Sequence, residues 1–240
     1  MLLESEQFKR TVYPQNPNMI RRVIIWAITI VIAIYLARQA RKPNKWLGRP
    51  FLWAMNLSHS ALTDWGLRQV FIEPDFKILD IGCGGGRTIQ KLSSVAAEGR
   101  VCGVDYSSGS VAVARSKNSQ LIKDGSVEIR QGSVSQLPFP DDYFDVATAV
   151  ETQYYWPDLV NDMKEVRRVL KPGGTFAVIA ETYRGGRFNS LMAPVMKLLS
   201  SSSLSVQDQK ELFVSAGYDD VKVIEEKKKG WICAIGRKPV

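Results

Sequence analysis

Short apolar runs alternate with amphipathic stretches from Lys77 to the end of the chain. Runs of five to seven apolar residues are typical of buried strands, and apolar residues spaced three and four apart are typical of helices. The predicted strands are 77–81, 100–105, 127–130, 144–150, 175–180, 221–224 and 232–235. The predicted helices are 87–95, 110–123, 159–170 and 207–216. This alternation predicts an α/β fold, a Rossmann-like and mostly parallel sheet whose ligands bind at the carboxyl ends of its strands.

The N-terminal part follows a different pattern. Residues 23–37 carry no charge and are apolar on every side of a helical wheel, whereas a surface helix would show a polar face. Arg21 and Arg22 precede this run and a larger group of cations follows it, so we predict a membrane helix with the following domain in the cytoplasm. At 1.5 Å per residue the run reaches only about 22 Å of a ~30 Å hydrocarbon core. A core helix of a soluble cytoplasmic protein is therefore the alternative.

These patterns divide the chain into four predicted parts: an N-terminal tail (1–19), a hydrophobic helix (20–40), a bridging helical segment (41–75) and an α/β domain (76–240). The bridge holds a helix-like stretch over 52–71. An insertion over 184–205, with an apolar segment at 188–199, precedes the last predicted helix. We expect it either to cover a substrate or to pack in the core.

The net charge of +8 belongs almost wholly to the N-terminal part. The first 50 residues hold nine Lys or Arg and two Glu, while the other 190 hold 23 basic and 22 acidic residues. A nucleic-acid enzyme would carry a basic surface on its folded domain, so we expect no nucleic-acid partner. The three cysteines, Cys83, Cys102 and Cys233, show no metal or disulfide spacing and are expected to be buried thiols. With a single histidine, His59, no metal site is expected.

A glycine loop, Asp80-Ile81-Gly82-Cys83-Gly84-Gly85-Gly86, lies between the first predicted strand and helix. Asp80 would repel a pyrophosphate, which prefers a bare helix N-terminus. It would attract the ammonium and sulfonium groups of S-adenosylmethionine. Asp105, at the end of the next strand, can accept hydrogen bonds from a ribose. Nicotinamide enzymes also have a glycine loop and an acidic residue that binds a ribose. An NAD(P)-dependent oxidoreductase is therefore the alternative.

Four segments together resemble the successive motifs of class I S-adenosylmethionine-dependent methyltransferases, in the ubiquinone/menaquinone-type small-molecule group. They are KILDIGCGGG (77–86), VCGVD (101–105), VEIRQGSVSQLPFPDDYFDVATA (127–149) and RVLKPGG (168–174). The resemblance covers 76–181 strongly. It implies a seven-stranded, mostly parallel sheet with an antiparallel C-terminal hairpin, and S-adenosyl-L-methionine as the cofactor.

The resemblance also implies roles for individual residues. The residues that would hold the cofactor are Asp80, Gly82, Cys83 and Gly84 at its methionine and ribose, Asp105 at its ribose, Tyr106, Ser133 and Val134 at its adenine, and Val150 and Glu151 beside the transferred methyl. Ser133 stands where the family has an acidic residue. A hydroxyl can still accept a bond from the adenine amino group, but without charge assistance.

The sequence identifies no catalytic residue. Methyl transfer needs mainly alignment of the reacting atoms, and only sometimes a base. Candidates are Glu151, as a base or an orienting group, Tyr154 and His59. Residues 154–156 would line an aromatic pocket or pack a helix start. We expect a methyltransferase acting on a small, lipophilic molecule. A non-catalytic membrane-tethered adaptor is a further alternative.

Overall fold

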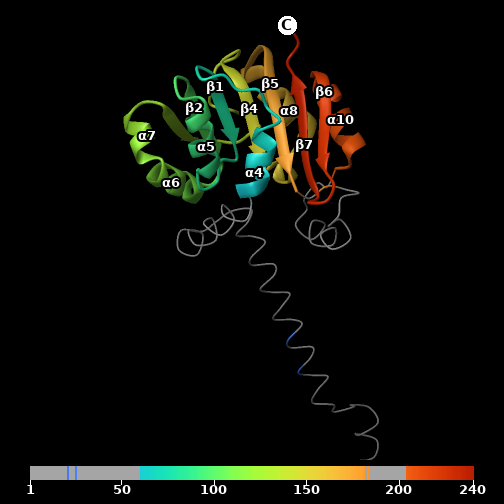
Figure 1. The fold of residues 1–240 in the computed structure, drawn as a ribbon, viewed down its shortest axis with the longest axis horizontal. Helices are drawn as coiled ribbons and strands as arrows, with labels where there is room; N and C mark the ends of the chain where they lie inside the picture. Colours follow the sequence, from blue (N-terminus) through green and yellow to red (C-terminus); the bar gives the residue numbers. More distant parts are fainter. Residues whose placement is uncertain (1–20, 22–24, 26–59, 182, 184–203) are drawn as a thin grey trace, which may run out of the picture. The chain divides into compact units, whose positions relative to one another are not determined.

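The computed structural model describes residues 21, 25, 60–181, 183 and 204–240 (Figure 1). The chain separates into two units, 1–40 and 41–240, and the fold below is that of the second. The predicted hydrophobic helix, His59 and nearly all of the predicted insertion lie outside the described residues. Among the helices that the structure describes, none has both the length and the apolar character needed to cross a bilayer.

Seven strands form one sheet in the order β3-β2-β1-β4-β5-β7-β6 (Figure 1). Their bounds are β1 Lys77–Ile81, β2 Arg100–Asp105, β3 Val127–Gln131, β4 Phe144–Val150, β5 Leu170–Ala180, β6 Asp219–Glu226 and β7 Trp231–Arg237. Neighbours among β1 to β5 pair in parallel, while β7 is antiparallel to both β5 and β6. The expected mostly parallel sheet with an antiparallel C-terminal hairpin is therefore confirmed.

Helices cover both faces of the sheet. Their bounds are α4 Ser60–Leu67, α5 Arg87–Val95, α6 Ser108–Lys117, α7 Ser119–Lys123, α8 Leu159–Val169 and α10 Val206–Ser215, with a 3₁₀ turn η1 at Gln153–Tyr155. Alternate residues of each strand point to opposite faces. Ile78 of β1 therefore joins a core with α5 and α6, and its neighbour Leu79 joins one with α8 and α10. The strand order reverses between β1 and β4, where such sheets bind ligands.

Three predicted elements differ from the structure by more than two residues, while several others shift by one or two residues at their ends. The helix-like stretch predicted over 52–71 ends at Leu67, and its part before residue 60 lies outside the described residues. The helix predicted over 110–123 is broken at Asn118, which caps the end of α6 before α7 begins. The fifth strand begins at Leu170 instead of 175, because Leu170 pairs with Phe144 across an irregularity in the register. Pro172 and two glycines in that stretch have a low strand propensity, so the sequence pattern did not predict a strand there.

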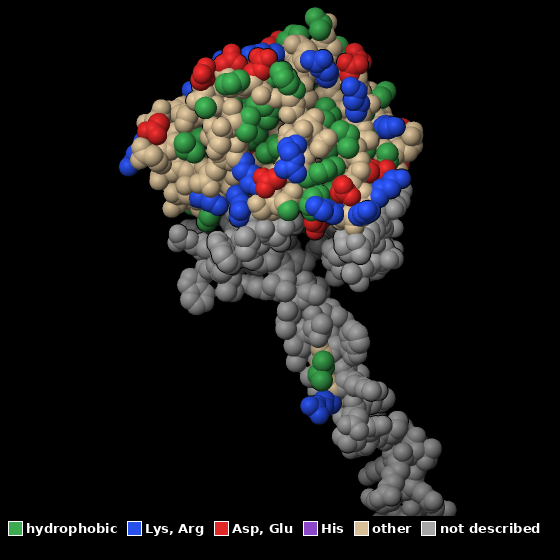
Figure 2. Space-filling view, in the orientation of Figure 1, with side chains coloured by type: hydrophobic (Ala, Val, Ile, Leu, Met, Phe, Trp, Pro, Cys, Tyr) green, Lys and Arg blue, Asp and Glu red, His purple; other side chains and the backbone are tan. Residues whose placement is uncertain are grey.

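Charge on the surface of the second unit is mixed. On the face shown in Figure 2, basic and acidic side chains are interspersed over the sheet and its helices. This agrees with the near balance of charge after residue 50.

Candidate active site

The predicted site residues gather at the carboxyl ends of β1, β2 and β4. Asp80 is paired in register with Gly103 of β2 on one side and with Thr148 of β4 on the other. Asp105 ends β2, and Glu151 directly follows β4. Because these strands are parallel neighbours, three carboxyl groups far apart in sequence lie at the same end of the sheet, where the strands have their carboxyl ends.

The glycine loop is a tight turn whose backbone conformation favours glycine. Gly82, Gly84 and Gly86 have φ angles of 70°, 51° and 75°, in the left-handed region. A Cβ atom on Gly82 would lie 2.4 Å from the Thr152 side chain. The Gly82 and Cys83 N–H groups both donate to the Val104 carbonyl, at 2.7 and 3.0 Å. The turn is thus fixed against the end of β2.

Asp105 organises the same turn through its side chain. The residue is 7% exposed. Its Oδ2 accepts the Gly84 N–H at 2.9 Å, and its Oδ1 accepts the Ser107 N–H at 2.8 Å. Burial raises the pKa of this carboxyl, and the two N–H donors oppose that shift. A carboxylate has about four acceptor positions, so Asp105 keeps the capacity to accept ribose hydroxyls.

Asp80 is buried with one oxygen uncompensated. The residue is 1% exposed, and its Oδ1 accepts the Thr148 hydroxyl at 3.0 Å. Its Oδ2 is buried and has no hydrogen-bond partner, and no Lys or Arg of the described residues pairs with it. Burial raises the pKa of Asp80 to about 7. The hydrogen bond from Thr148 opposes this shift, and the nearby Asp105 charge adds to it. Such a group favours a cationic ligand, which would stabilise its charged form.

The residues expected at the adenine follow the adjacent ends of β2 and β3, where Asp105 pairs with Gln131. Tyr106 is 44% exposed. Ser133 is also exposed, and its hydroxyl accepts the Ser135 N–H at 3.2 Å. Val134 is buried and belongs to the larger core cluster. These three residues thus follow the carboxyl ends of the neighbouring strands β2 and β3.

Glu151 occupies a strained position after β4. Its φ of 58° is unusual for a residue with a side chain. Its Oε1 accepts the Tyr154 hydroxyl at 3.0 Å and the Glu181 N–H at 2.6 Å. Burial and the nearby Glu181 charge raise the pKa of Glu151 to about 8, against the opposing effect of those two donors. Outliers of this kind cluster at functional sites, where the surroundings hold the strain.

The three aromatic residues that follow β4, at 154–156, differ in burial. Trp156 is buried and stacks on Phe176 with ring centroids 6.1 Å apart, so it serves packing. Tyr154 and Tyr155 are partly exposed, and Tyr154 hydrogen-bonds to Glu151. The packing alternative for this segment therefore applies to Trp156.

Cys83 lies in the glycine turn as a buried thiol. It is 6% exposed, and burial together with the charges of Asp80 and Asp105 raises its pKa well above the usual range. Cys102 and Cys233 are likewise buried and free, as expected. Within the described part of the chain, no three His, Cys, Asp or Glu side chains are grouped to hold a metal ion.

Sequence reasoning missed three residues that shape the site. Thr148 bonds to Asp80, and the Thr152 hydroxyl donates to the Ile81 carbonyl at 3.2 Å. The Asn118 amide donates to the Gly86 carbonyl at 3.0 Å. Thr148 carried a signal, because it is a polar residue in an apolar strand. Asn118 and Thr152 lie in helix-like and loop-like sequence, where such residues are common.

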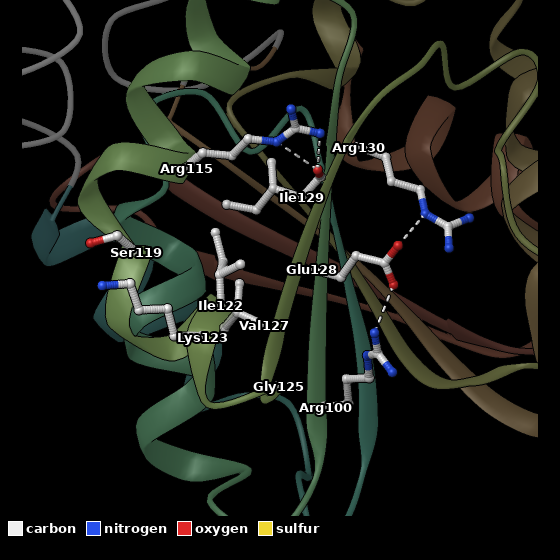
Figure 3. Close-up of a pocket in the computed structure, with 10 residues that line it drawn as sticks. All are labelled: Arg100, Arg115, Ser119, Ile122, Lys123, Gly125, Val127, Glu128, Ile129 and Arg130. Carbon is white, nitrogen blue, oxygen red and sulfur yellow. Dashed lines mark hydrogen bonds and ion pairs between the residues drawn. The ribbon is translucent and has the colours of Figure 1, made fainter.

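A pocket of about 620 Å³ lies elsewhere, at the open edge of β3 (Figure 3). Glu128 pairs there with Arg100 at 2.9 Å and with Arg130 at 2.5 Å. Arg115 donates to the Ile129 carbonyl at 2.7 Å. None of the predicted cofactor-binding residues lines this pocket, so it is separate from the candidate site.

Comparison with known proteins identifies a domain in the middle of the chain. Residues 79–178 match the model of a methyltransferase domain. The chain is 25% identical to an uncharacterized methyltransferase, YdaC of Bacillus subtilis, over 78% of this chain and 97% of that one. It is 33% identical to the demethylmenaquinone methyltransferase of Symbiobacterium thermophilum, over 50% of this chain and only about half (48%) of that protein's length.

A solved structure shares the fold. The Haloferax volcanii methyltransferase in complex with its activator Trm112 has a TM-score of 0.68 and 22% identity. The alignment covers 79% of this chain and 94% of that one. At this level of identity the likeness concerns the fold.

The residues at the site suit S-adenosylmethionine, the cofactor of such enzymes. Its ammonium and sulfonium are cations, and the uncompensated Asp80 oxygen is an acceptor for a cation. The left-handed glycines of the turn carry no side chains, which close approach of a ligand to the backbone requires. The family match likewise favours this cofactor over the nicotinamide alternative. With its motifs, its seven-stranded sheet and the match of residues 79–178, the chain contains a methyltransferase domain with the fold of class I S-adenosylmethionine-dependent methyltransferases.

Proposed function

We propose that this enzyme methylates a small, lipophilic acceptor at the carboxyl ends of β1 and β4. The observation that carries the proposal is Asp80, a buried carboxyl with one oxygen uncompensated beside a turn of left-handed glycines. We assign the cofactor to Asp80, Gly82, Cys83, Gly84, Asp105, Tyr106, Ser133, Val134 and Glu151.

Each part of the site has a distinct task in this proposal. The bound cofactor supplies an electrophilic methyl group. The Asp80 carboxylate attracts its positive charge, and Asp105 accepts hydrogen bonds from its ribose while fixing Gly84. Tyr106 packs on the adenine, and the Ser133 hydroxyl accepts a bond from the adenine amino group. These contacts orient the methyl, which is the main requirement of an in-line displacement.

Glu151 faces the acceptor in this proposal. With a pKa of about 8, its carboxyl is protonated in most molecules at pH 7 and can donate a hydrogen bond to the acceptor. Glu151 therefore orients the acceptor at neutral pH, and gains the capacity to accept a proton as the pH rises. A Glu151→Gln variant keeps a donor and should retain most of its activity at pH 7, whereas Glu151→Ala should lose roughly a hundredfold.

Three features support a lipophilic acceptor. The demethylmenaquinone methyltransferase named above acts on a lipophilic quinone, as its name states. The insertion over 188–199 is apolar in sequence, and so is the run over 23–37. We propose that the latter run anchors the chain in a membrane with the catalytic domain (76–240) in the cytoplasm, where S-adenosylmethionine is available.

The decisive experiment uses the full chain and cofactor carrying a labelled methyl group. Isothermal titration should show binding of S-adenosylmethionine and none of NAD(P). Incubation with extracted membrane lipids and with a soluble metabolite extract should then place the label in the lipid fraction. Label in RNA or protein alone would refute the acceptor class. Binding without turnover on any fraction would favour the adaptor alternative.

A further inference from the structure

A buried asparagine holds the far end of the glycine turn. Asn118 is 1% exposed and lies between α6 and α7, 32 positions after Gly86. Its Nδ2 donates to the Gly86 carbonyl at 3.0 Å and to the Ala114 carbonyl at 2.8 Å. One side-chain amide therefore links the end of α6 to the start of α5.

The orientation of this amide is fixed by its surroundings. Two carbonyl oxygens face Nδ2, so the flipped amide would set its own oxygen against both of them. Asn118 Oδ1 is buried and has no hydrogen-bond partner. Such a group costs free energy, which indicates that the two donated bonds outweigh an unsatisfied acceptor.

Among the glycines of the turn, Gly86 is the one whose carbonyl accepts the Asn118 amide. It precedes α5 with a left-handed backbone and has no side-chain cap of its own. Its N–H donates to Cys83 within the turn at 2.9 Å, and its carbonyl accepts from Asn118. A Cβ atom on Gly86 would lie 2.4 Å from Asn118 Nδ2, so the two residues are in close contact.

The turn is thus held at two points by side chains from outside it. Asp105 holds the Gly84 N–H from the end of β2, and Asn118 holds the Gly86 carbonyl from the α6–α7 junction. We propose that Asn118 is a positioning residue for cofactor binding, which keeps the backbone between Gly84 and Gly86 in its binding conformation without touching the cofactor. This inference rests on the proposed assignment of the glycine turn to the cofactor.

The test measures binding of S-adenosylhomocysteine to the full chain by isothermal titration. Asn118→Ala should weaken binding roughly tenfold, because a buried carbonyl loses its donor. With a lipid acceptor, the KM for S-adenosylmethionine should rise by a similar factor while kcat at saturating cofactor stays within about twofold. The matched control is Asn161→Ala, which removes another Asn side-chain bond (to Asp158, 2.8 Å) on α8 and should leave the affinity unchanged.

A second variant separates positioning from general stability. Asn118→Asp offers a hydrogen-bond donor to Gly86 only when its carboxyl is protonated, so its affinity relative to wild type should recover as the pH falls. A structural role alone would show no such recovery. If Asn118→Ala does not fold, Asn118→Ser, with a shorter donor, replaces it in the same titration.

Two outcomes overturn the inference. One is unchanged affinity in Asn118→Ala, and the other is an equal loss in Asn161→Ala. Asp105→Asn distinguishes this failure from failure of the proposed function. If Asp105→Asn weakens binding and Asn118→Ala does not, only the role of Asn118 is wrong. If neither weakens binding, the glycine turn is not the cofactor site.

Discussion

Acidic side chains at the two ends of the parallel sheet differ in whether they pair with a cation. At the amino ends of the strands, Asp145 pairs with Lys171 at 2.6 Å and Asp142 pairs with Lys238 at 2.6 Å. At the carboxyl ends, neither Asp80 nor Asp105 pairs with a Lys or Arg of the described residues, and both have raised pKa values. The acids at one end are paired with cations of the fold, and those at the other end accept only uncharged donors among the described residues.

The difference has a simple physical reading. A buried carboxyl without a cation costs stability, and a protein that keeps one at a ligand-binding edge gains binding energy instead. Paired acids at the amino ends contribute to folding and bind nothing further. The comparison therefore predicts that substitutions at the two ends separate cofactor affinity from stability.

The largest expected effect is on cofactor affinity at the carboxyl end. In the proposed function Asp80 faces the cationic cofactor, so Asp80→Asn, which removes its charge, should raise the dissociation constant at least roughly a hundredfold at pH 8. Asp145→Asn is the matched control, since Asp145 bonds to the Lys77 N–H and to Lys171 at the amino end. It should lower the melting temperature and leave the affinity unchanged. Equal effects of the two variants on affinity would remove the distinction between the two ends.

The next effect concerns the pH dependence of stability. Asp80 and Glu151 have model-compound pKa values of 3.8 and 4.5 and folded values of about 7 and about 8. Their protonated forms favour the folded state, so their contribution is fully present below about pH 4 and is lost as the pH rises to about 8. From pH 5 to pH 9, the free energy of unfolding of Asp80→Asn should gain about 2–3 kcal/mol relative to wild type. Parallel curves in urea unfolding would contradict the raised pKa of Asp80.

A stability effect of similar or smaller size is expected at the amino end. Arg168 donates to the Leu137 and Phe139 carbonyls and pairs with Glu165 at 2.7 Å. Arg168→Ala leaves these groups without their donor and should cost about 2 kcal/mol in denaturant unfolding. Binding of S-adenosylhomocysteine, measured below the midpoint, should stay within about twofold of wild type. A large loss of affinity would mean that the two ends are coupled.

The smallest effect sharpens the adenine assignment. Ser133 is exposed, and the resemblance to the methyltransferase motifs implies an acidic residue at its position. Ser133→Asp adds a charged acceptor, and hydrogen bonds to charged groups are stronger, so the affinity for S-adenosylmethionine should rise roughly threefold. Ser135→Asp, two residues on, is the control and should have no such effect. No gain in Ser133→Asp would place the adenine elsewhere.

Much of the fold followed from periodicity alone. The strands at 77–81, 100–105 and 144–150 and the helix at 87–95 have the predicted bounds, because each is a strongly patterned run that ends at glycine or a polar cluster. The break at Asn118 did not follow, because a helical pattern continues through it and the reason for the break is a contact with Gly86. The early start of β5 did not follow either, since pairing with β4 overrides the local preference of Pro172 and its glycines.

What the sequence by itself determined is the resemblance to a methyltransferase domain, the order of elements and the residue types of the glycine loop, all of which are local patterns. Which groups hold that loop was decided only by the tertiary structure. Parallel pairing sets Thr148 beside Asp80, and the packing of α6 against α5 brings Asn118 to Gly86. These contacts join residues 32 to 68 positions apart, and burial turns them into a raised pKa at Asp80 and a fixed backbone at Gly86. Neither the raised pKa nor the fixed backbone can be derived from the spacing of residues along the chain.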